Sequence, residues 1–300
     1  MNNSIIQKII EENEVWSDPK VCLEAVKRNG DNLQYVLKQT PEICIAAVKN
    51  CSYAIEYVIN QTPEICMAAI RKNADVLKYI RNQTPEICVA ALRKNGELLQ
   101  YVKHQTHEIC MVAVKKNGEA LQYVRKQTAV ICLTAVERNW NAIKLAQIQS
   151  PEICMTAVKK NGNALMFVRK QTPEICMAAV KQKWEALKYV ETQTYEICME
   201  AVRQNGKALK YVNEQTLDIC LTAVKQDPSA LLYVSNQTLE ICSEAIKQDG
   251  QLLEHINIQT PEICLAAVRQ NGALLMHVKI QTPEICAEAI KQDPEAYTYV

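Results

Sequence analysis

Residues 84–105 read TPEICVAALRKNGELLQYVKHQ, and this 22-residue pattern recurs along almost the whole chain of 300 residues. The cysteines show it most clearly, because thirteen of the fourteen follow one another at intervals of 22 residues and only Cys51 is out of phase. The phased residues are Cys22, Cys44, Cys66, Cys88, Cys110, Cys132, Cys154, Cys176, Cys198, Cys220, Cys242, Cys264 and Cys286. A fixed period of about 20 to 50 residues is typical of a repeat protein. Since the phase never slips, we expect the same backbone path in every repeat.

The first half of each repeat has the pattern of a short amphipathic helix. Thr84, Pro85 and Glu86 are typical of a helix N-terminus, because the hydroxyl caps free amides, proline has a helical φ and the carboxylate faces the positive helix end. The predicted buried face of this helix has the spacing of one helical stripe. It consists of Ile87, Cys88, Ala91 and Leu92.

The second half of each repeat predicts another short helix of about two turns. Asn95 and Gly96 are expected to end the first helix in a left-handed turn. The predicted inner face of the second helix is Leu98, Leu99, Tyr101 and Val102. Nine of the thirteen repeats have tyrosine at the position of Tyr101, and we expect these rings to pack with a hydrogen-bonded hydroxyl.

Helices this short are marginal in water when isolated, so the repeats must be stabilised by stacking on one another. The sequence therefore predicts an all-α fold, an α-solenoid of thirteen 22-residue two-helix repeats forming a superhelix. Residues 17–300 would form one elongated domain, with residues 1–16 as an N-terminal capping helix. The C-terminal end shows no cap after Tyr299 and Val300, which predicts either a homo-oligomer formed through that end or weak order of the final two repeats.

The composition excludes several classes of protein. A net charge of +1 argues against binding nucleic acid or membranes by bulk charge. No apolar run approaches the roughly 18 residues of a membrane span, and the first 16 residues contain glutamates where a signal peptide would be apolar. We therefore expect a cytoplasmic protein, and thirteen reduced thiols would suit a reducing compartment.

Two runs, ICMAAV at residues 175–180 and NGEALQYV at residues 117–124, carry a resemblance to a known family. They resemble a short helical repeat catalogued as a domain of unknown function, which is frequent in giant DNA viruses of amoebae and in intracellular bacteria. The likeness extends from about residue 17 to the end of the chain. It implies a helical array and a viral or host-manipulating setting, in which case the protein would lie in the host cytoplasm or be associated with the virus. It implies no catalytic residues.

The regular cysteines and glutamines have both functional and structural interpretations. Stacked helices lie about 8–10 Å apart, too far for a disulfide or a shared zinc ion, so we interpret the cysteines as core side chains. Glutamine stands five places before Cys44 and before every later phased cysteine. It could bind a ligand, but an amide that bonds the loops between repeats explains its regularity, and we favour that interpretation. We predict no metal site and no cofactor.

A catalytic site requires unlike residues that converge on one point, whereas a repeat spreads the same residue along a line. The sequence contains no phosphate-binding loop, nucleophile elbow or zinc-protease motif. We therefore predict that the protein is not an enzyme.

Departures from the repeat pattern indicate a candidate binding site. Residues 62–171 contain 17 Lys and Arg against 8 Asp and Glu, which predicts a one-sided basic patch beside Trp140 and Trp184. Each tryptophan replaces the repeat's glycine, either as an exposed interface anchor or as a cover over its own repeat. The candidate partner-binding residues are Trp140, Trp184, Arg138, Lys159, Lys160, Lys183, Lys116, Arg125, Lys126, Arg169 and Lys170.

These observations favour a non-catalytic scaffold that binds a protein partner of acidic or mixed charge, centred on residues 72–184. One alternative is a helical-repeat protein that binds RNA or single-stranded nucleic acid through the basic central repeats. Against it, the regular aromatic residues are expected to be buried and residues 172–300 carry an excess of acidic side chains. A second alternative is a structural protein that assembles with copies of itself.

Overall fold

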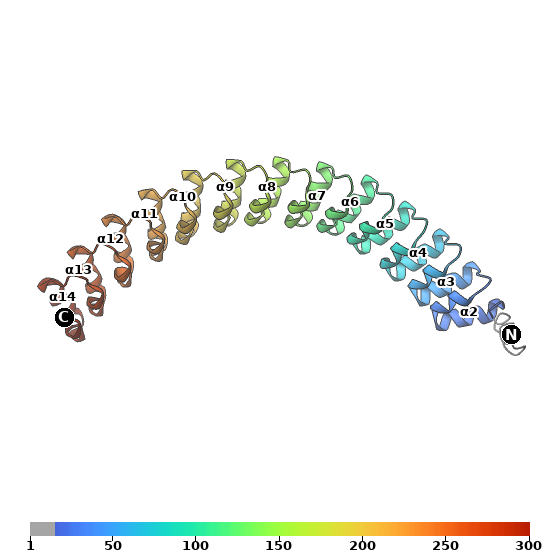
Figure 1. The fold of residues 1–300 in the computed structure, drawn as a ribbon, viewed down its shortest axis with the longest axis horizontal. Coiled ribbons are helices and arrows are strands. Elements are labelled where there is room, and N and C mark those ends of the chain that lie inside the picture. The colour runs from blue at the N-terminus through green and yellow to red at the C-terminus, as the bar shows by residue number, and fades with distance from the viewer. Residues whose placement is uncertain (1–15) are drawn as a thin grey trace, which may run out of the picture. The chain divides into compact units, whose positions relative to one another are not determined.

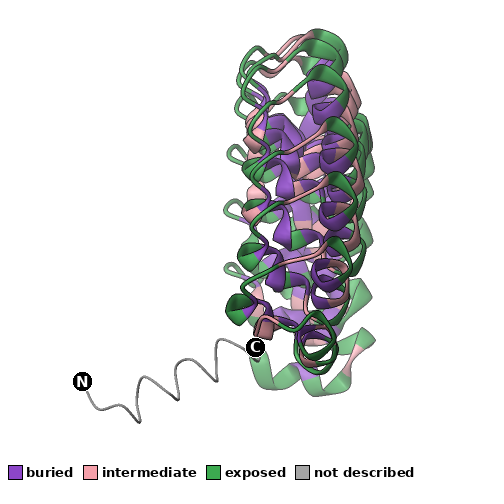
Figure 2. Cartoon of the chain, turned by 90° about the vertical axis from the view of Figure 1, so that its right-hand side faces the viewer, coloured by how far each residue is buried: buried purple, intermediate pink, exposed green. Residues whose placement is uncertain are grey.

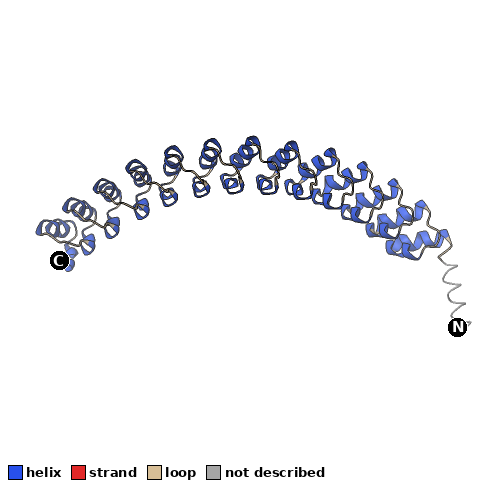
Figure 3. Cartoon of the chain, turned by 45° about the horizontal axis from the view of Figure 1, so that its top comes forward, coloured by secondary structure: helices blue, strands red, loops and turns tan. Residues whose placement is uncertain are grey.

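The computed structural model describes residues 16–300. The chain divides into two compact units, residues 1–153 and 154–300, and each is described by itself. In both units an α-helix of ten residues alternates with a 3-10 helix of six residues at a step of 22 residues (Figure 1). Short loops join these helices, and the described residues contain no strand (Figure 3). The predicted all-α solenoid of 22-residue repeats is confirmed.

The α-helices begin at the predicted capping positions. At α5 (Pro85–Lys94) the hydroxyl of Thr84 accepts a hydrogen bond from the N–H of Ile87 at 3.4 Å, and bonds to the backbone and to Thr84 lower the pKa of Glu86. The other α-helices are α2 (Pro19–Arg28), α3 (Pro41–Asn50), α4 (Pro63–Lys72), α6 (His107–Lys116), α7 (Ala129–Arg138), α8 (Pro151–Lys160), α9 (Pro173–Gln182), α10 (Tyr195–Gln204), α11 (Leu217–Gln226), α12 (Leu239–Gln248), α13 (Pro261–Gln270) and α14 (Pro283–Gln292).

The α-helices do not end in the predicted left-handed turn. Asn95, which follows α5, has φ −143° and ψ 111°, and no glycine in the described part of the chain has a positive φ. Gly96 instead allows a close approach, because a Cβ atom there would lie 2.5 Å from the carbonyl oxygen of Ala113 in the next repeat. Repeats with a larger residue in this place, such as Ala74, must therefore hold the next repeat slightly farther away.

The second segment of each repeat is a 3-10 helix of six residues, which confirms the predicted short second helix and specifies its type. The predicted inner face of this segment is only partly buried, since Leu98 and Leu99 are buried whereas Tyr101 is 39% exposed. The segments are η1 (Gly30–Tyr35), η2 (Ser52–Tyr57), η3 (Ala74–Tyr79), η4 (Gly96–Tyr101), η5 (Gly118–Tyr123), η6 (Trp140–Leu145), η7 (Gly162–Phe167), η8 (Trp184–Tyr189), η9 (Gly206–Tyr211), η10 (Pro228–Tyr233), η11 (Gly250–His255), η12 (Gly272–His277) and η13 (Pro294–Tyr299).

The core of each unit lies between the α-helices and the 3-10 helices (Figure 2). The phased cysteines are buried from Cys22 to Cys264, as predicted, but Cys286 is only half-buried. All cysteines of the described residues are free thiols. The alanine three places after each cysteine is fully buried from Ala47 onward, and Ala113 is an example with 0% exposure. Small side chains at these two positions let neighbouring helices approach closely.

Within each unit, neighbouring α-helices pack against one another and against the 3-10 helix of the preceding repeat, as α3 does with α4 and η1. The predicted capping helix at residues 1–16 lies outside the described residues, except for Trp16. The Trp16 ring lies 5.4 Å from the ring of Tyr35, and the Trp16 carbonyl accepts a hydrogen bond from the thiol of Cys22.

Candidate interaction surfaces

The glutamine of each repeat connects two neighbouring loops, which confirms its structural interpretation. The side chain of Gln61 donates to the carbonyl oxygens of Ile55 and Tyr79 at 2.9 and 3.1 Å, and it accepts from the N–H of Arg81 at 2.8 Å. Gln39 makes the same contacts with Leu33, Tyr57 and Ile59. These bonds satisfy loop groups that have no helical partner, so the loops are held in the same conformation from one repeat to the next.

The loops expose two consecutive side chains in every repeat, directly before the glutamine. We call this row the loop edge. It consists of residues 37–38, 59–60, 81–82, 103–104, 125–126 and 147–148 in the first unit, and of residues 169–170, 191–192, 213–214, 235–236, 257–258 and 279–280 in the second. All of these residues are exposed, although their backbone is fixed by the glutamines. The loop edge therefore combines a constant frame, which is the loop backbone held by the glutamines, with exposed side chains that vary from repeat to repeat.

The chemistry of the loop edge changes along each unit. In the first unit it begins with apolar residues, such as Ile59 at 67% exposure, and becomes basic at residues 103–104 and 125–126. In the second unit it is basic at residues 169–170 and acidic at Glu191 and Glu214. It ends in that unit with exposed Ile258 and Ile280.

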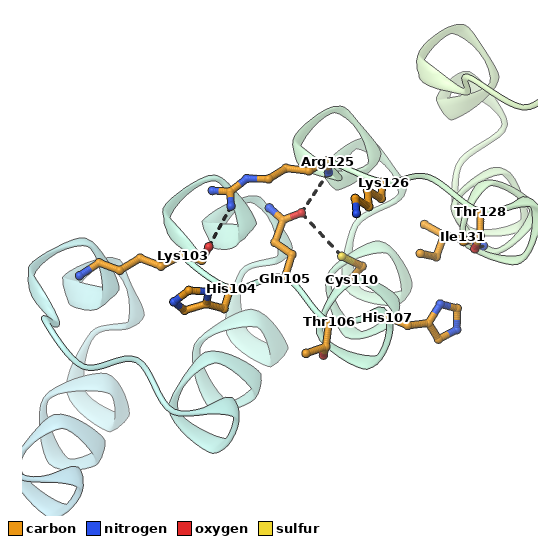
Figure 4. Close-up of a pocket in the computed structure, with 10 residues that line it drawn as sticks. All are labelled: Lys103, His104, Gln105, Thr106, His107, Cys110, Arg125, Lys126, Thr128 and Ile131. Atoms are coloured by element: carbon orange, nitrogen blue, oxygen red, sulfur yellow. Dashed lines mark hydrogen bonds between the residues drawn. The ribbon is translucent and has the colours of Figure 1, made fainter.

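A hollow of about 430 Å³ opens between two loops of the first unit (Figure 4). Its lining residues are Lys103, His104, Gln105, Thr106, His107, Cys110, Arg125, Lys126, Thr128 and Ile131. The guanidinium of Arg125 donates to the carbonyl oxygens of Lys103 and Val102 at 2.8 and 3.3 Å, so this cation also holds the neighbouring loop. Sequence reasoning selected Arg125 and Lys126 but missed Lys103 and the two histidines, which are far from the tryptophans in the chain.

The equivalent hollow at residues 191–219 has the opposite charge, because Glu191 and Glu214 line it. Burial raises the pKa of the Cys198 thiol to about 11, and the negative charge of Glu214 contributes to the rise. Burial also raises the pKa of Cys110, but there the positive charge of Arg125 opposes the rise. The cysteines below the two hollows therefore experience opposite electrostatic fields.

The remaining candidate cations lie at the other end of the α-helices. Lys116 and Arg138 are the last residues of α6 and α7, whereas Lys126 lies beside the start of α6 in the hollow with His107. A helix of ten residues is about 15 Å long, so these positions lie about that far apart along the helix. The basic residues are divided between the loop edge and a second row, which we call the helix-end edge and define as the last two residues of each α-helix.

The second unit repeats this division. Lys159 and Lys160 are exposed at the end of α8, whereas Arg169 and Lys170 belong to the loop edge. Lys183 follows α9 and is half-buried, with its ammonium 3.7 Å from a carboxylate oxygen of Glu185.

Trp140 and Trp184 are both half-buried at the start of a 3-10 helix, the first in the first unit and the second in the second unit. The Trp184 ring is stacked on the Tyr211 ring of the next repeat, with centroids 6.2 Å apart. The ammonium of Lys210 lies 5.8 Å from the centroid of the Trp184 ring. This packing shows that Trp184 covers part of the following repeat.

The tyrosines of the 3-10 helices are not buried, contrary to expectation. Tyr35, Tyr57 and Tyr101 are 52%, 38% and 39% exposed, and lysine ammonium groups lie 4.8 and 4.7 Å from the ring centroids of Tyr79 and Tyr189. Rings with a neighbouring cation are suited to contacts with a partner.

A second amide contact, which sequence reasoning missed, occurs at the helix-end edge. Gln270, the last residue of α13, accepts from the N–H of Gly250 at 2.8 Å and donates to the carbonyl oxygen of Ile246. Gln226 accepts from Gly206 in the same way, and Asn50 accepts from Gly30 at 2.8 Å. We call this contact the amide clamp. It joins the last residue of one α-helix to the start of the 3-10 helix in the preceding repeat.

No three His, Cys, Asp or Glu side chains in residues 16–300 are grouped to hold a metal ion. None of the helices in this part of the chain has the length and apolar character required to cross a membrane.

A family model described as "Domain of unknown function (DUF4116)" matches residues 18–62, 84–128, 150–194, 174–217, 194–239 and 216–260. Each match spans two consecutive repeats, and several matches overlap by one repeat, so the pairs have no fixed phase. A search of curated proteins gave no match. Because the six matches together cover about two thirds of the sequence, the chain belongs to the DUF4116 family of helical repeats.

Proposed function

We propose that the protein is a non-catalytic scaffold that binds a protein partner through the loop edge. The observation that supports this function is the combination of a constant frame with variable side chains. Gln61 and its equivalents fix the backbone of each loop, while the exposed pair beside it is apolar, basic, acidic or neutral. Repeat proteins commonly use such an extended surface for binding.

The mixed chemistry of the loop edge favours a protein over a nucleic acid. A phosphate backbone is negative at every step and would be repelled by Glu191 and Glu214. A polypeptide can place an acidic side chain opposite Lys126, a basic one opposite Glu214 and an apolar one opposite Ile59. A repeated frame spreads equivalent side chains along a line, and this is the reason to propose binding without catalysis.

A second candidate function is the binding of single-stranded nucleic acid, and the exposed tyrosines favour it. Bases stack on such rings, and Lys78 and Lys188 place cations beside the half-buried rings of Tyr79 and Tyr189. The expected burial of these rings was an argument against this function, and the structure removes that argument. A steep fall of affinity with salt would support it.

Affinity capture with the full chain distinguishes the two functions. The immobilised protein is incubated with lysate before and after nuclease treatment, in three forms: wild type, K103E/K126E and E191K/E214K. We expect protein partners that survive nuclease treatment and that at least one charge reversal removes. Capture that disappears with nuclease, or that neither reversal changes, would contradict the proposed loop-edge scaffold.

A further inference from the structure

The amide clamp is replaced by a cation in four consecutive repeats of the first unit. The replacements at the last position of the α-helix are Lys72, Lys94, Lys116 and Arg138. A cationic side chain can donate but cannot accept a hydrogen bond. Lys94 keeps the donor half of the clamp, because its ammonium donates to the carbonyl oxygen of Arg71. The acceptor half is lost in all four repeats.

These four cations are exposed and have no carboxylate partner. No ion pair in residues 16–300 involves Lys72, Lys116 or Arg138. The preceding residue is also basic in three of the four repeats, at Arg71, Arg93 and Lys115. A dipole-matched helix end accounts for one cation per repeat, as Lys225 beside Gln226 illustrates in the second unit. In these three repeats the helix end therefore carries one cation more than the dipole accounts for, at a position where other repeats have the clamp acceptor.

We propose that Lys72, Lys94, Lys116 and Arg138 dock an acidic polypeptide segment along the helix-end edge of the first unit. This surface lies at the opposite end of the α-helices from the loop edge, so the proposal goes beyond the function proposed above. Charge complementarity identifies the chemistry of the occupant, since four unpaired cations occur at one per repeat.

Carboxylates on the same edge favour a polypeptide over a nucleic acid. Asp75, Glu97 and Glu119 stand at the starts of η3, η4 and η5, beside the ends of the α-helices. Glu97 and Glu119 are held in place by hydrogen bonds from Asn117 and Asn139 at 3.0 and 3.3 Å. A continuous phosphate backbone would meet one of these charges in each repeat. A polypeptide can place acidic side chains only opposite the cations.

The spacing of the repeats suggests where those acidic side chains should stand. Neighbouring helices pack about 8–10 Å apart. In an extended polyproline-type segment, every third residue faces the same way and lies about 9 Å farther along. The preferred occupant therefore has an acidic residue at every third position.

The test is a titration of the full chain with a fluorescent twelve-residue peptide of repeating Glu-Pro-Pro, at about 50 mM salt, followed by fluorescence anisotropy. The clamp-restoring variant should fold, because glutamine occupies the same position at the ends of α9 to α14 in the second unit. A control variant removes the same charge from the helix-end edge of that second unit. The two variants are K72Q/K94Q/K116Q/R138Q and K181Q/R203Q/K225Q/K247Q.

We expect the clamp-restoring variant to bind the peptide at least about tenfold more weakly, because it removes four exposed ion pairs that each contribute a small factor. The control variant should change the affinity less than about twofold, because its substitutions lie outside the proposed binding surface. Equal losses in both variants would show that bulk charge attracts the peptide and would overturn the proposal. So would an unchanged affinity, the absence of binding by the wild type, or tighter binding of a single-stranded RNA of equal charge.

Discussion

The helix-end edges of residues 72–138 and of residues 182–292 share one backbone but use it differently. In the second region glutamine ends every α-helix, and Gln226 and Gln270 accept from a glycine N–H in the preceding repeat. In the first region lysine or arginine takes this position and cannot accept that bond. One region therefore gains contacts between repeats, and the other gains exposed charge. The comparison teaches that the last residue of the α-helix can either bond the preceding repeat or add an exposed charge to the helix-end edge.

We expect the greatest loss of stability from substitutions at the buried alanine, a feature that both regions share. Ala113 in the first unit and Ala179 in the second are both fully buried where neighbouring helices meet. Ala113→Leu and Ala179→Leu should each lower the free energy of unfolding by about 1–3 kcal/mol or more, because the larger side chain has no room. Cys176→Ala should cost less, since it removes little volume. Urea unfolding followed by circular dichroism measures all three, and a costlier Cys176→Ala would mean that the alanine is not the close contact.

Removing a clamp from the second region should have the next largest effect. Gln226→Lys leaves the N–H of Gly206 without its acceptor, and an unsatisfied buried donor costs about 1–3 kcal/mol. Lys225→Gln, one residue away, is the matched control and should have little effect on stability. If both variants unfold at the same urea concentration, the clamp does not stabilise the stack of repeats.

The reverse exchange in the first region should have a smaller, stabilising effect. Lys116→Gln supplies an acceptor for the N–H of Gly96, and one additional hydrogen bond contributes about 0.5–1.5 kcal/mol. Lys115→Gln removes the same charge without a clamp and should not stabilise the protein. A destabilised Lys116→Gln variant would show that the two regions are not built on the same frame.

The smallest effect concerns the thiols below the two loop-edge hollows. The pKa of Cys198 is raised by burial and by Glu214 from its usual 9.0 to about 11, so the stability that its neutral form contributes is present below pH 9 and lost as the pH rises through 11. Between pH 9 and 10 we expect Cys198 to be alkylated more slowly than Cys110, which lies near Arg125. Peptide mass mapping measures both rates. Glu214→Gln should lower the pKa of Cys198, and an unchanged rate would contradict the assigned cause.

Most of the frame could be predicted from the sequence because it depends on strict periodicity. The buried cysteines, the tight alanine positions and the glutamine contacts between loops all occur where the spacing of 22 residues places them. The caps of the α-helices, such as Thr84 before Pro85, were also predictable from local chemistry.

The remaining features depend on how neighbouring repeats meet, which the spacing does not describe. Six residues are too few to distinguish an α-helix from a 3-10 helix, so the exposed side of Tyr101 could not be assigned. Gly96 was expected to need a left-handed turn, but the nearby carbonyl of Ala113 explains it. Lys116 and Lys126 are close in the sequence yet lie at opposite ends of α6, because the 3-10 helix reverses the chain between them.

Hydrogen exchange of backbone amides in the native full chain tests the comparison most directly. The N–H of Gly206 bonds to Gln226, and the N–H of Gly250 bonds to Gln270, whereas Lys116 offers no acceptor to the N–H of Gly96. We expect slower exchange at Gly206 and Gly250 than at Gly96, and slower exchange at Gly96 after Lys116→Gln. Equal protection at the three glycines, unchanged by that substitution, would contradict the exchange of a clamp for a charge.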